Sequence, residues 1–239
     1  MTNSELQQRE STRSGVVGYV GDTVETSNRA RKLFRLFKRY PQWLNILDVG
    51  CATGSLLAPF ASANKITGYD VSSNLLERAL QNGYQQVKVV DISSQPFPAS
   101  DGEFDLVFCG EAIEHVVDTD WLLCECNRVL VPGGHLILTF PNVRTLLGVA
   151  MLALFNRPPM YAARYRAFHV RDFTTYHMRQ ALANNGFKVL RNIGSDFYVP
   201  RLGGCASFLA TYLPSWASTV IVQAQKINQA VYDPNNFTD

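Results

Sequence analysis

Residues 45–57 read NILDVGCATGSLL, and this stretch decides the fold. Its first five residues are a short, mostly apolar run of the kind that forms a buried strand. Gly50 and Gly54 allow a tight turn after that strand and let a ligand approach the backbone closely. We therefore predict a strand over 45–49, a glycine turn, and a helix over 55–63 whose first amide groups can bind a carboxylate.

Strand and helix patterns alternate from this stretch toward the C-terminus. The predicted strands are 45–49, 65–70, 86–90, 104–109, 135–140, 187–193 and 219–224, and the predicted helices are 55–63, 73–81, 119–130 and 173–184. Such alternation indicates crossover units and a parallel sheet. We predict an α/β fold with a doubly wound, mostly parallel, seven-stranded sheet. Residues 1–25 are expected to be a flexible N-terminus, and 26–239 one domain with a cap inserted at about 143–171.

The composition excludes several classes of protein. Hydrophobic residues make up 46% and charged residues 18% of the 239 residues, which fits a globular chain rather than a disordered one. The net charge of +2 gives no reason to expect nucleic-acid binding. Five cysteines without zinc-type spacing, and no apolar segment within residues 1–28, favour reduced thiols in the cytoplasm.

A basic amphipathic helix precedes the first strand. Within residues 29–40, apolar residues recur at helical spacing between six lysines and arginines, and Pro41 ends the pattern. Two interpretations stay open: a helix with a basic outer face that touches an anionic membrane surface, or one that packs on the domain and simply solvates that face. The basic residues are Arg29, Arg31, Lys32, Arg35, Lys38 and Arg39.

Acidic residues follow successive strands, at the edge where a doubly wound sheet binds its ligand. Asp70 lies 22 residues after Asp48, a spacing suited to accepting hydrogen bonds from both hydroxyls of a ribose. Asp91 could accept from an adenine amino group while Ile92 lies against the ring. A dinucleotide fingerprint would need glycines where the loop has Ala52 and Ser55, which argues against a nicotinamide-dependent oxidoreductase.

Five segments within residues 46–142 carry a family resemblance: ILDVGCATGSL, GYDVS, VVDIS, FDLVFCGEAIEHV and RVLVPGGHLILTFPN. They resemble the motifs of class I S-adenosylmethionine-dependent methyltransferases, in order and at normal spacing. The resemblance implies a Rossmann-like fold and a cofactor site in which Glu111 faces the reacting sulfonium. Ala52 departs from the glycine that the family often has there. The implied cofactor-binding residues are Asp48, Gly50, Cys51, Ala52, Gly54, Asp70, Val71, Asp91, Ile92 and Glu111.

The segment Glu111–His115 also resembles ubiquinone-pathway O-methyltransferases, in which such a run can hold Mg²⁺. Because the same run occurs in methyltransferases without a metal, we expect no metal here, with Mg²⁺ at Glu111, Glu114 and His115 as the alternative. His115 and His169 are the expected catalytic bases for a hydroxyl acceptor. The structural alternative is that His115 orients its loop and His169 fixes the cap.

The cap at 143–171 is apolar and aromatic and contains five arginines. This composition suits a small-molecule acceptor with an apolar or lipid-like body and an anionic end. We therefore predict methyl transfer to a small molecule, at oxygen. The alternatives are a nicotinamide-dependent oxidoreductase on a related sheet and a non-catalytic protein that binds an adenosyl ligand.

Overall fold

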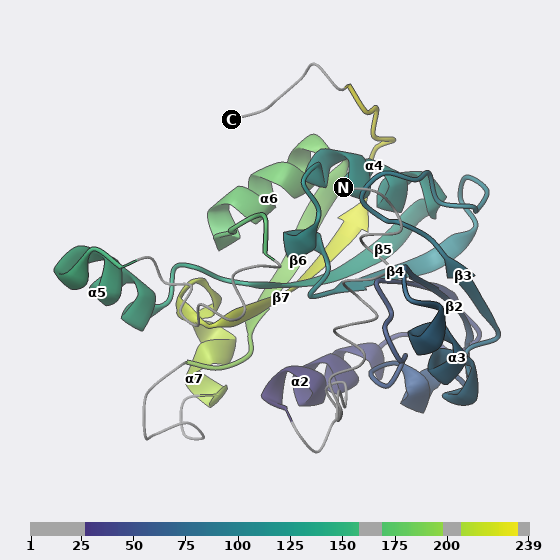
Figure 1. Ribbon diagram of the computed structural model, residues 1–239, viewed down its shortest axis with the longest axis horizontal. Helices are drawn as coiled ribbons and strands as arrows, with labels where there is room; N and C mark the ends of the chain where they lie inside the picture. The colour runs from purple at the N-terminus through teal and green to yellow at the C-terminus, as the bar shows by residue number, and fades with distance from the viewer. Residues whose placement is uncertain (1–26, 158–168, 198–206, 234–239) are drawn as a thin grey trace.

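The computed structural model describes residues 27–157, 169–197 and 207–233 (Figure 1). One seven-stranded sheet has the order β3-β2-β1-β4-β5-β7-β6, parallel except for β7, which runs antiparallel to both neighbours. The chain order reverses between β1 and β4, which creates the switch point where such sheets bind ligands. The strands are β1 (Asn45–Val49), β2 (Lys65–Asp70), β3 (Gln86–Val89), β4 (Phe104–Gly110), β5 (Leu130–Pro141), β6 (Phe187–Gly194) and β7 (Thr219–Lys226).

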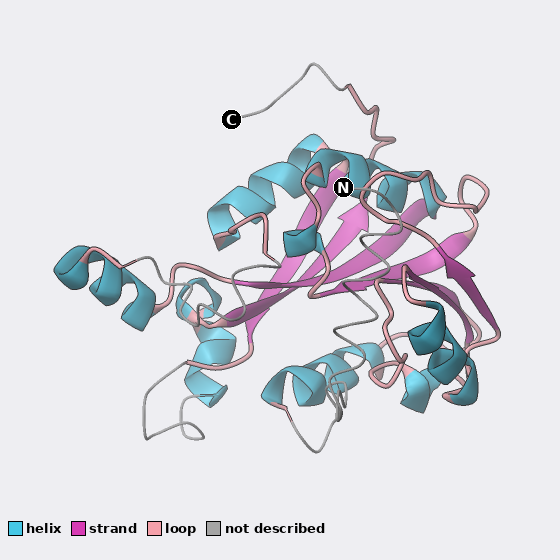
Figure 2. Ribbon diagram, in the orientation of Figure 1, coloured by secondary structure: helices cyan, strands magenta, loops and turns pink. Residues whose placement is uncertain are grey.

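Helices cover both faces of the sheet (Figure 2). The predicted fold class is confirmed, and so is each predicted strand, although β5 is longer at both ends than predicted. Among the described residues, no helix is long and apolar enough to cross a membrane. The helices are α2 (Asn28–Phe37), α3 (Ser73–Gln81), α4 (Thr119–Val129), α5 (Leu146–Phe155), α6 (Thr175–Asn184) and α7 (Ser207–Tyr212), with 3-10 turns η1 (Ala58–Phe60), η2 (Ile113–His115) and η3 (Pro214–Trp216).

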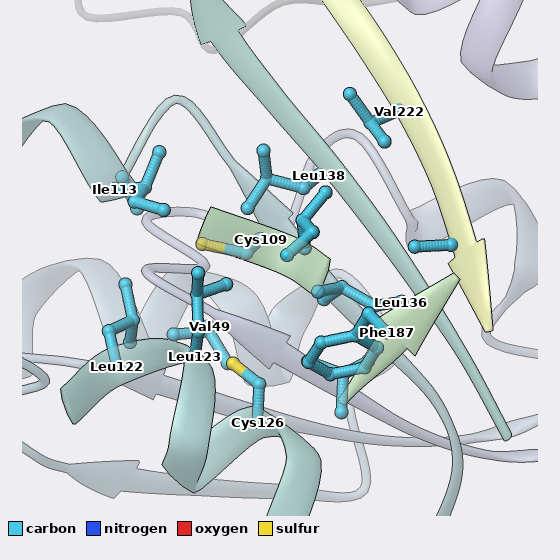
Figure 3. Close-up of a cluster of buried hydrophobic side chains, with 14 of the residues drawn as sticks. Val49, Cys109, Ile113, Leu122, Leu123, Cys126, Leu136, Leu138, Phe187 and Val222 are labelled. Carbon is cyan, nitrogen blue, oxygen red and sulfur yellow. The ribbon is translucent and has the colours of Figure 1, made fainter. Parts of the chain in front are cut away.

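The core has two halves, one on each face of the sheet. On one face, α4 contributes Leu122 and Leu123, and α6 contributes Leu182, to a cluster that also contains the thiols of Cys109 and Cys126 (Figure 3). On the other face, α2 and α3 pack Leu33 and other apolar side chains against the sheet. The parallel strands between these halves are buried on both sides, as continuous apolar runs require.

The predicted helix at 55–63 is wrong. The chain keeps one α-type hydrogen bond there, from the Ala58 N–H to the Gly54 carbonyl at 3.0 Å, and then forms only the three-residue turn η1. Pro59 lies in that turn, has no N–H to donate, and would clash with the preceding helical turn. The backbone that was expected to start a helix and bind a carboxylate through its first amide groups is therefore a series of turns.

The basic helix forms as α2, but its basic face is not entirely outward. Lys32 turns inward, and its ammonium donates to the carbonyls of Gly194, Ser195 and Ser207 at 2.6 to 2.8 Å. Arg29 is also turned toward the sheet, with a side chain only 17% exposed. The other four basic residues of the segment are exposed, namely Arg31, Arg35, Lys38 and Arg39.

The predicted cap is described only in part. Residues 146–155 form α5, and residues 158–168, which include the predicted aromatic lining, lie outside the described residues. The chain returns at His169, and Phe173 forms a bridge with Asn142 before α6 begins. Helix α6 starts two residues later than predicted because the Thr174 side chain caps it by accepting from the His177 N–H.

Candidate functional site

The carboxyl ends of β2, β1 and β4 lie level with one another. Val49 pairs with Tyr69 on one side and with Cys109 on the other, and Asp70 pairs with Val89. The residues that follow each strand therefore meet at one edge of the sheet, beside the switch point. This register brings the loops after β1, β2, β3 and β4 together, as the sequence predicted.

The turn after β1 has a left-handed backbone at three positions. Gly50, Ala52 and Gly54 have φ values of +71°, +48° and +68°. The glycines confirm the predicted tight turn, but protein atoms fill the space beside them. A Cβ on Gly54 would lie 2.6 Å from a ring carbon of Tyr84, and one on Gly50 would lie 2.8 Å from the Ala112 Cβ. These glycines therefore allow close packing of the protein itself.

Tyr84 lies beneath this turn and bonds to Asp48. Its hydroxyl donates to the Asp48 carboxylate at 2.5 Å, and both side chains are buried. Burial raises the pKa of Asp48 to about 7, opposed by the bond from Tyr84 and reinforced by the nearby charge of Asp70. Burial likewise raises the pKa of the Cys51 thiol, whose side chain packs in the core next to Gly68. Only the backbone of Cys51 can therefore face a ligand.

Asp70 joins the turn after β1 to the turn after β2. One carboxylate oxygen accepts from the Ala52 N–H and the other from the Ser72 N–H, both at 2.9 Å. The side chain is half-buried, so the carboxylate lies partly open at the edge of the sheet where a ligand's hydroxyls could donate to it. Val71, the next residue in the turn after β2, is also half-buried.

Asp91 is buried in a local turn after β3. Its carboxylate accepts from the backbone and hydroxyl of Ser93, at 3.0 and 2.6 Å, and from the Ser94 hydroxyl at 2.7 Å. These bonds shape the turn and place the half-buried Ile92 close to Gly50. The arrangement favours Asp91 as a support for the apolar wall that Ile92 offers, alongside its predicted contact with adenine.

Glu111, after β4, lies beside the N-terminal helix. It has a left-handed φ of +53°, and its N–H donates to the carbonyl and hydroxyl of Thr139 at 3.1 and 3.0 Å. Its carboxylate is 3.4 Å from the Arg29 guanidinium, which also donates to the Thr139 hydroxyl at 3.2 Å. Helix α2 thus contributes a cation to the same edge of the sheet, where Glu111 is 30% exposed.

The two predicted bases come together across the cap boundary. The rings of His115, in η2, and His169 meet edge to face with centroids 5.0 Å apart. The Glu114 carbonyl accepts from the N–H groups of Val170 and Arg171 at 2.9 and 3.2 Å, which attaches the returning cap to η2. Position 169 is therefore held close to the end of β4.

A candidate metal group is also present there, although no metal was predicted, and it differs from the alternative set of Glu111, Glu114 and His115. Glu114, His115 and His169 each offer one ligand atom, and these atoms lie within 4.8 Å of one another. Glu111 pairs with Arg29 instead. Two imidazoles and one carboxylate suit a transition metal better than Mg²⁺, which prefers oxygen ligands. The residues therefore fit the Mg²⁺ alternative poorly.

Sequence reasoning missed Tyr84 and Arg29. Tyr84 precedes β3 and belongs to no recognised motif. The signal that could have revealed it is a pair of glycines, Gly54 and Gly68, which both leave room for the same large ring. Arg29 was counted with the basic face of its helix, and its spacing gave no sign that it points toward Glu111.

Comparisons with known proteins agree with this geometry. Residues 47–138 match the model of a family described as a methyltransferase domain. A ubiquinone biosynthesis O-methyltransferase of Thiobacillus denitrificans is 35% identical over 102 residues, which are 41% of this chain and 44% of that protein. One from Xanthomonas oryzae pv. oryzae is 30% identical over 167 residues, covering 65% and 66% of the two chains. The matches thus span less than two thirds of these relatives' own length.

A solved structure extends the similarity in fold. The S-adenosylmethionine-dependent methyltransferase of Thermotoga maritima, described as a possible histamine N-methyltransferase, has a TM-score of 0.61 and 20% identity. The alignment covers 94% of this chain and 98% of that one. The matches favour a methyltransferase over a nicotinamide-dependent oxidoreductase.

Proposed function

The chain belongs to the class I S-adenosylmethionine-dependent methyltransferases, and from this premise we propose that it methylates an oxygen atom of a small-molecule acceptor. The observation that carries the proposal is the gathering of Asp48, Asp70, Asp91 and Glu111 at level strand ends beside the switch point. The names of the relatives, ubiquinone biosynthesis O-methyltransferases, suggest a hydroxylated aromatic ring as the acceptor class.

The residues at this edge match the polar groups of the donor. The half-buried carboxylate of Asp70 suits the ribose hydroxyls, with Val71 next to it in the chain, and Ile92 offers an apolar surface for the adenine. Glu111 is suited to the donor's amino group, and Arg29 to its carboxylate. The backbone of 50–54 supplies the remaining wall, and Asp48 braces that backbone from beneath through Tyr84.

The donor's sulfonium carries a methyl group that is already activated for transfer to a nucleophile. The protein's own residues must therefore align the acceptor oxygen, exclude water and remove its proton. His115 or His169 takes that proton, since the two rings lie together at the end of β4 where the cap returns. No step in this proposal requires a metal.

Direct binding and transfer assays test the proposal. Calorimetry should detect binding of S-adenosylmethionine and of its demethylated product. Transfer of a radiolabelled methyl group to catechols and quinols with short, soluble side chains should then identify the acceptor. Binding without transfer to any oxygen acceptor, but with transfer to amines, would replace the oxygen assignment. Absence of binding by the folded protein would refute the proposal as a whole.

Two finer expectations also stay proposals. Peripheral membrane contact through residues 29–40 is supported by the four exposed basic side chains of that segment. A cytoplasmic location is supported by four buried cysteines that are free thiols, namely Cys51, Cys109, Cys124 and Cys126.

A further inference from the structure

Helix α5 is apolar on all sides and yet exposed. Its sequence is LLGVAMLALF, and Gly148 is its one buried residue. Leu154 and Phe155 are 74% and 64% exposed. A helix that is apolar all round is ordinarily buried in protein or in a lipid phase. Figure 1 shows α5 projecting from one end of the molecule, away from the sheet.

Helix α7 adds a second apolar segment at the same end. Phe208 and Tyr212 are 71% and 69% exposed, and their rings lie 5.2 Å apart. Of the 18 large hydrophobic side chains exposed among the described residues, nine lie in two short segments, 146–155 and 208–213. Exposure on this scale marks an interaction surface rather than scattered surface residues.

Hydrogen bonds connect the two segments and α2. The Asn142 amide, just before α5, donates to the carbonyls of Ser215 and Ala217 around η3, at 3.1 and 2.8 Å. Helix α7 leads directly into η3, and its first residue accepts from Lys32 of α2. We call the exposed side chains of α2, α5 and α7 with their flanking residues the apolar-basic end.

The charged side chains that the three helices themselves contribute are all basic. Helices α2, α5 and α7 contain no aspartate or glutamate. Arg144 and Arg157 flank α5 and are exposed, and Arg144 lies over the Trp216 ring at 4.0 Å. Two acidic residues lie beside α2: Asp196, which is half-buried and accepts from Asn28, and Glu111, which pairs with Arg29. Apolar side chains edged by exposed cations match the apolar interior and anionic headgroups of a membrane surface.

We propose that the apolar-basic end binds an anionic phospholipid bilayer, with α5 and α7 entering its outer layer and α2 facing the headgroups. Helix α5 has ten residues and is therefore about 15 Å long, about half the thickness of the hydrocarbon core. It suits immersion in one leaflet. This contact extends that of residues 29–40 and does not depend on methyl transfer.

Vesicle sedimentation of the full chain tests the inference. Vesicles of phosphatidylcholine are compared with vesicles containing about one third phosphatidylglycerol. We expect binding to the anionic vesicles that weakens as salt is added, since salt screens exposed charges. The variant Leu154→Glu/Phe155→Glu should reduce partition by about tenfold or more. Arg35→Glu/Arg39→Glu should reduce partition into anionic vesicles by a similar factor.

Leu80→Glu is the matched control, because Leu80 is also an exposed apolar residue but lies on α3, away from the apolar-basic end. It should bind vesicles as the parent does. Equal binding by the α5 variant, or no vesicle binding by the parent, would overturn the inference. So would sedimentation showing that the α5 residues join two copies of the chain without binding lipid. Donor affinity, measured on every variant, separates this outcome from failure of the proposed methyl transfer.

Discussion

Replacement of Asp48 by asparagine should make the protein more stable at neutral and alkaline pH. The Asp48 carboxyl is buried and bonded to Tyr84, and burial raises its pKa from 3.8 to about 7. In the unfolded chain the group ionises near its usual pKa. Between these two values the folded protein therefore binds one more proton than the unfolded chain, and the free energy of unfolding falls as the pH rises.

The size of the effect follows from the difference between the two pKa values. A difference of one corresponds to about 1.4 kcal/mol, so the change from 3.8 to about 7 amounts to about 4 kcal/mol. The stabilisation from neutral Asp48 is complete below pH 3.8 and is lost once the pH exceeds about 7. Asparagine keeps the shape and the acceptor for Tyr84 and cannot ionise, so Asp48→Asn should lack this loss.

Urea unfolding of parent and variant at several pH values measures the difference. Between about pH 5 and pH 7, the free energy of unfolding of the variant should rise relative to that of the parent by up to about 3 kcal/mol. Above that range the difference between the two proteins should stay constant. Asp172→Asn, at an exposed carboxylate, controls for the loss of one negative charge. If the free energies of unfolding of the parent and of Asp48→Asn differ by the same amount at every pH in this range, the argument is refuted.

Three further changes test other parts of the site. Gly54→Ala should destabilise the fold by about 2 to 4 kcal/mol in thermal or urea unfolding, because its φ is +68° and its Cβ would lie 2.6 Å from the Tyr84 ring; an unchanged midpoint would show that Tyr84 moves freely. His115→Ala/His169→Ala should lower kcat by about 10² to 10⁴-fold with the donor Kd unchanged, and if chelators alone produce the same loss in the parent, a metal rather than a base is needed. Arg29→Ala should weaken donor binding about tenfold in calorimetry, whereas an equal Kd would remove Arg29 from the donor site.

The sheet could be predicted from sequence because its parallel strands are short apolar runs between turn residues. Burial on both faces demands such runs, and the acidic residues at their ends mark where each strand stops. The same reasoning failed at 55–63, where it predicted a helix that the structure does not contain. Its apolar residues fit a helical period, but Pro59 removes the hydrogen bond that the second turn would need.

The sequence predicted which residues lie at the strand ends, but it did not predict which groups those residues contact. The sequence placed Asp70 at the end of β2, but only the structure shows that it receives N–H groups from two different loops. His115 and His169 were chosen separately, and their contact depends on how the cap folds back over 54 residues. Such long-range pairing leaves no periodic trace in a single sequence.

The bonds of Lys32 connect the beginning of the chain with its last quarter. The carbonyls that receive this ammonium lie 162 to 175 residues away in sequence. During synthesis, these three bonds can form only after residues 194 to 207 have left the ribosome. The apolar side of α2 packs on strands made much earlier, so the helix can dock on the growing sheet first and be secured by Lys32 only at a late stage of folding.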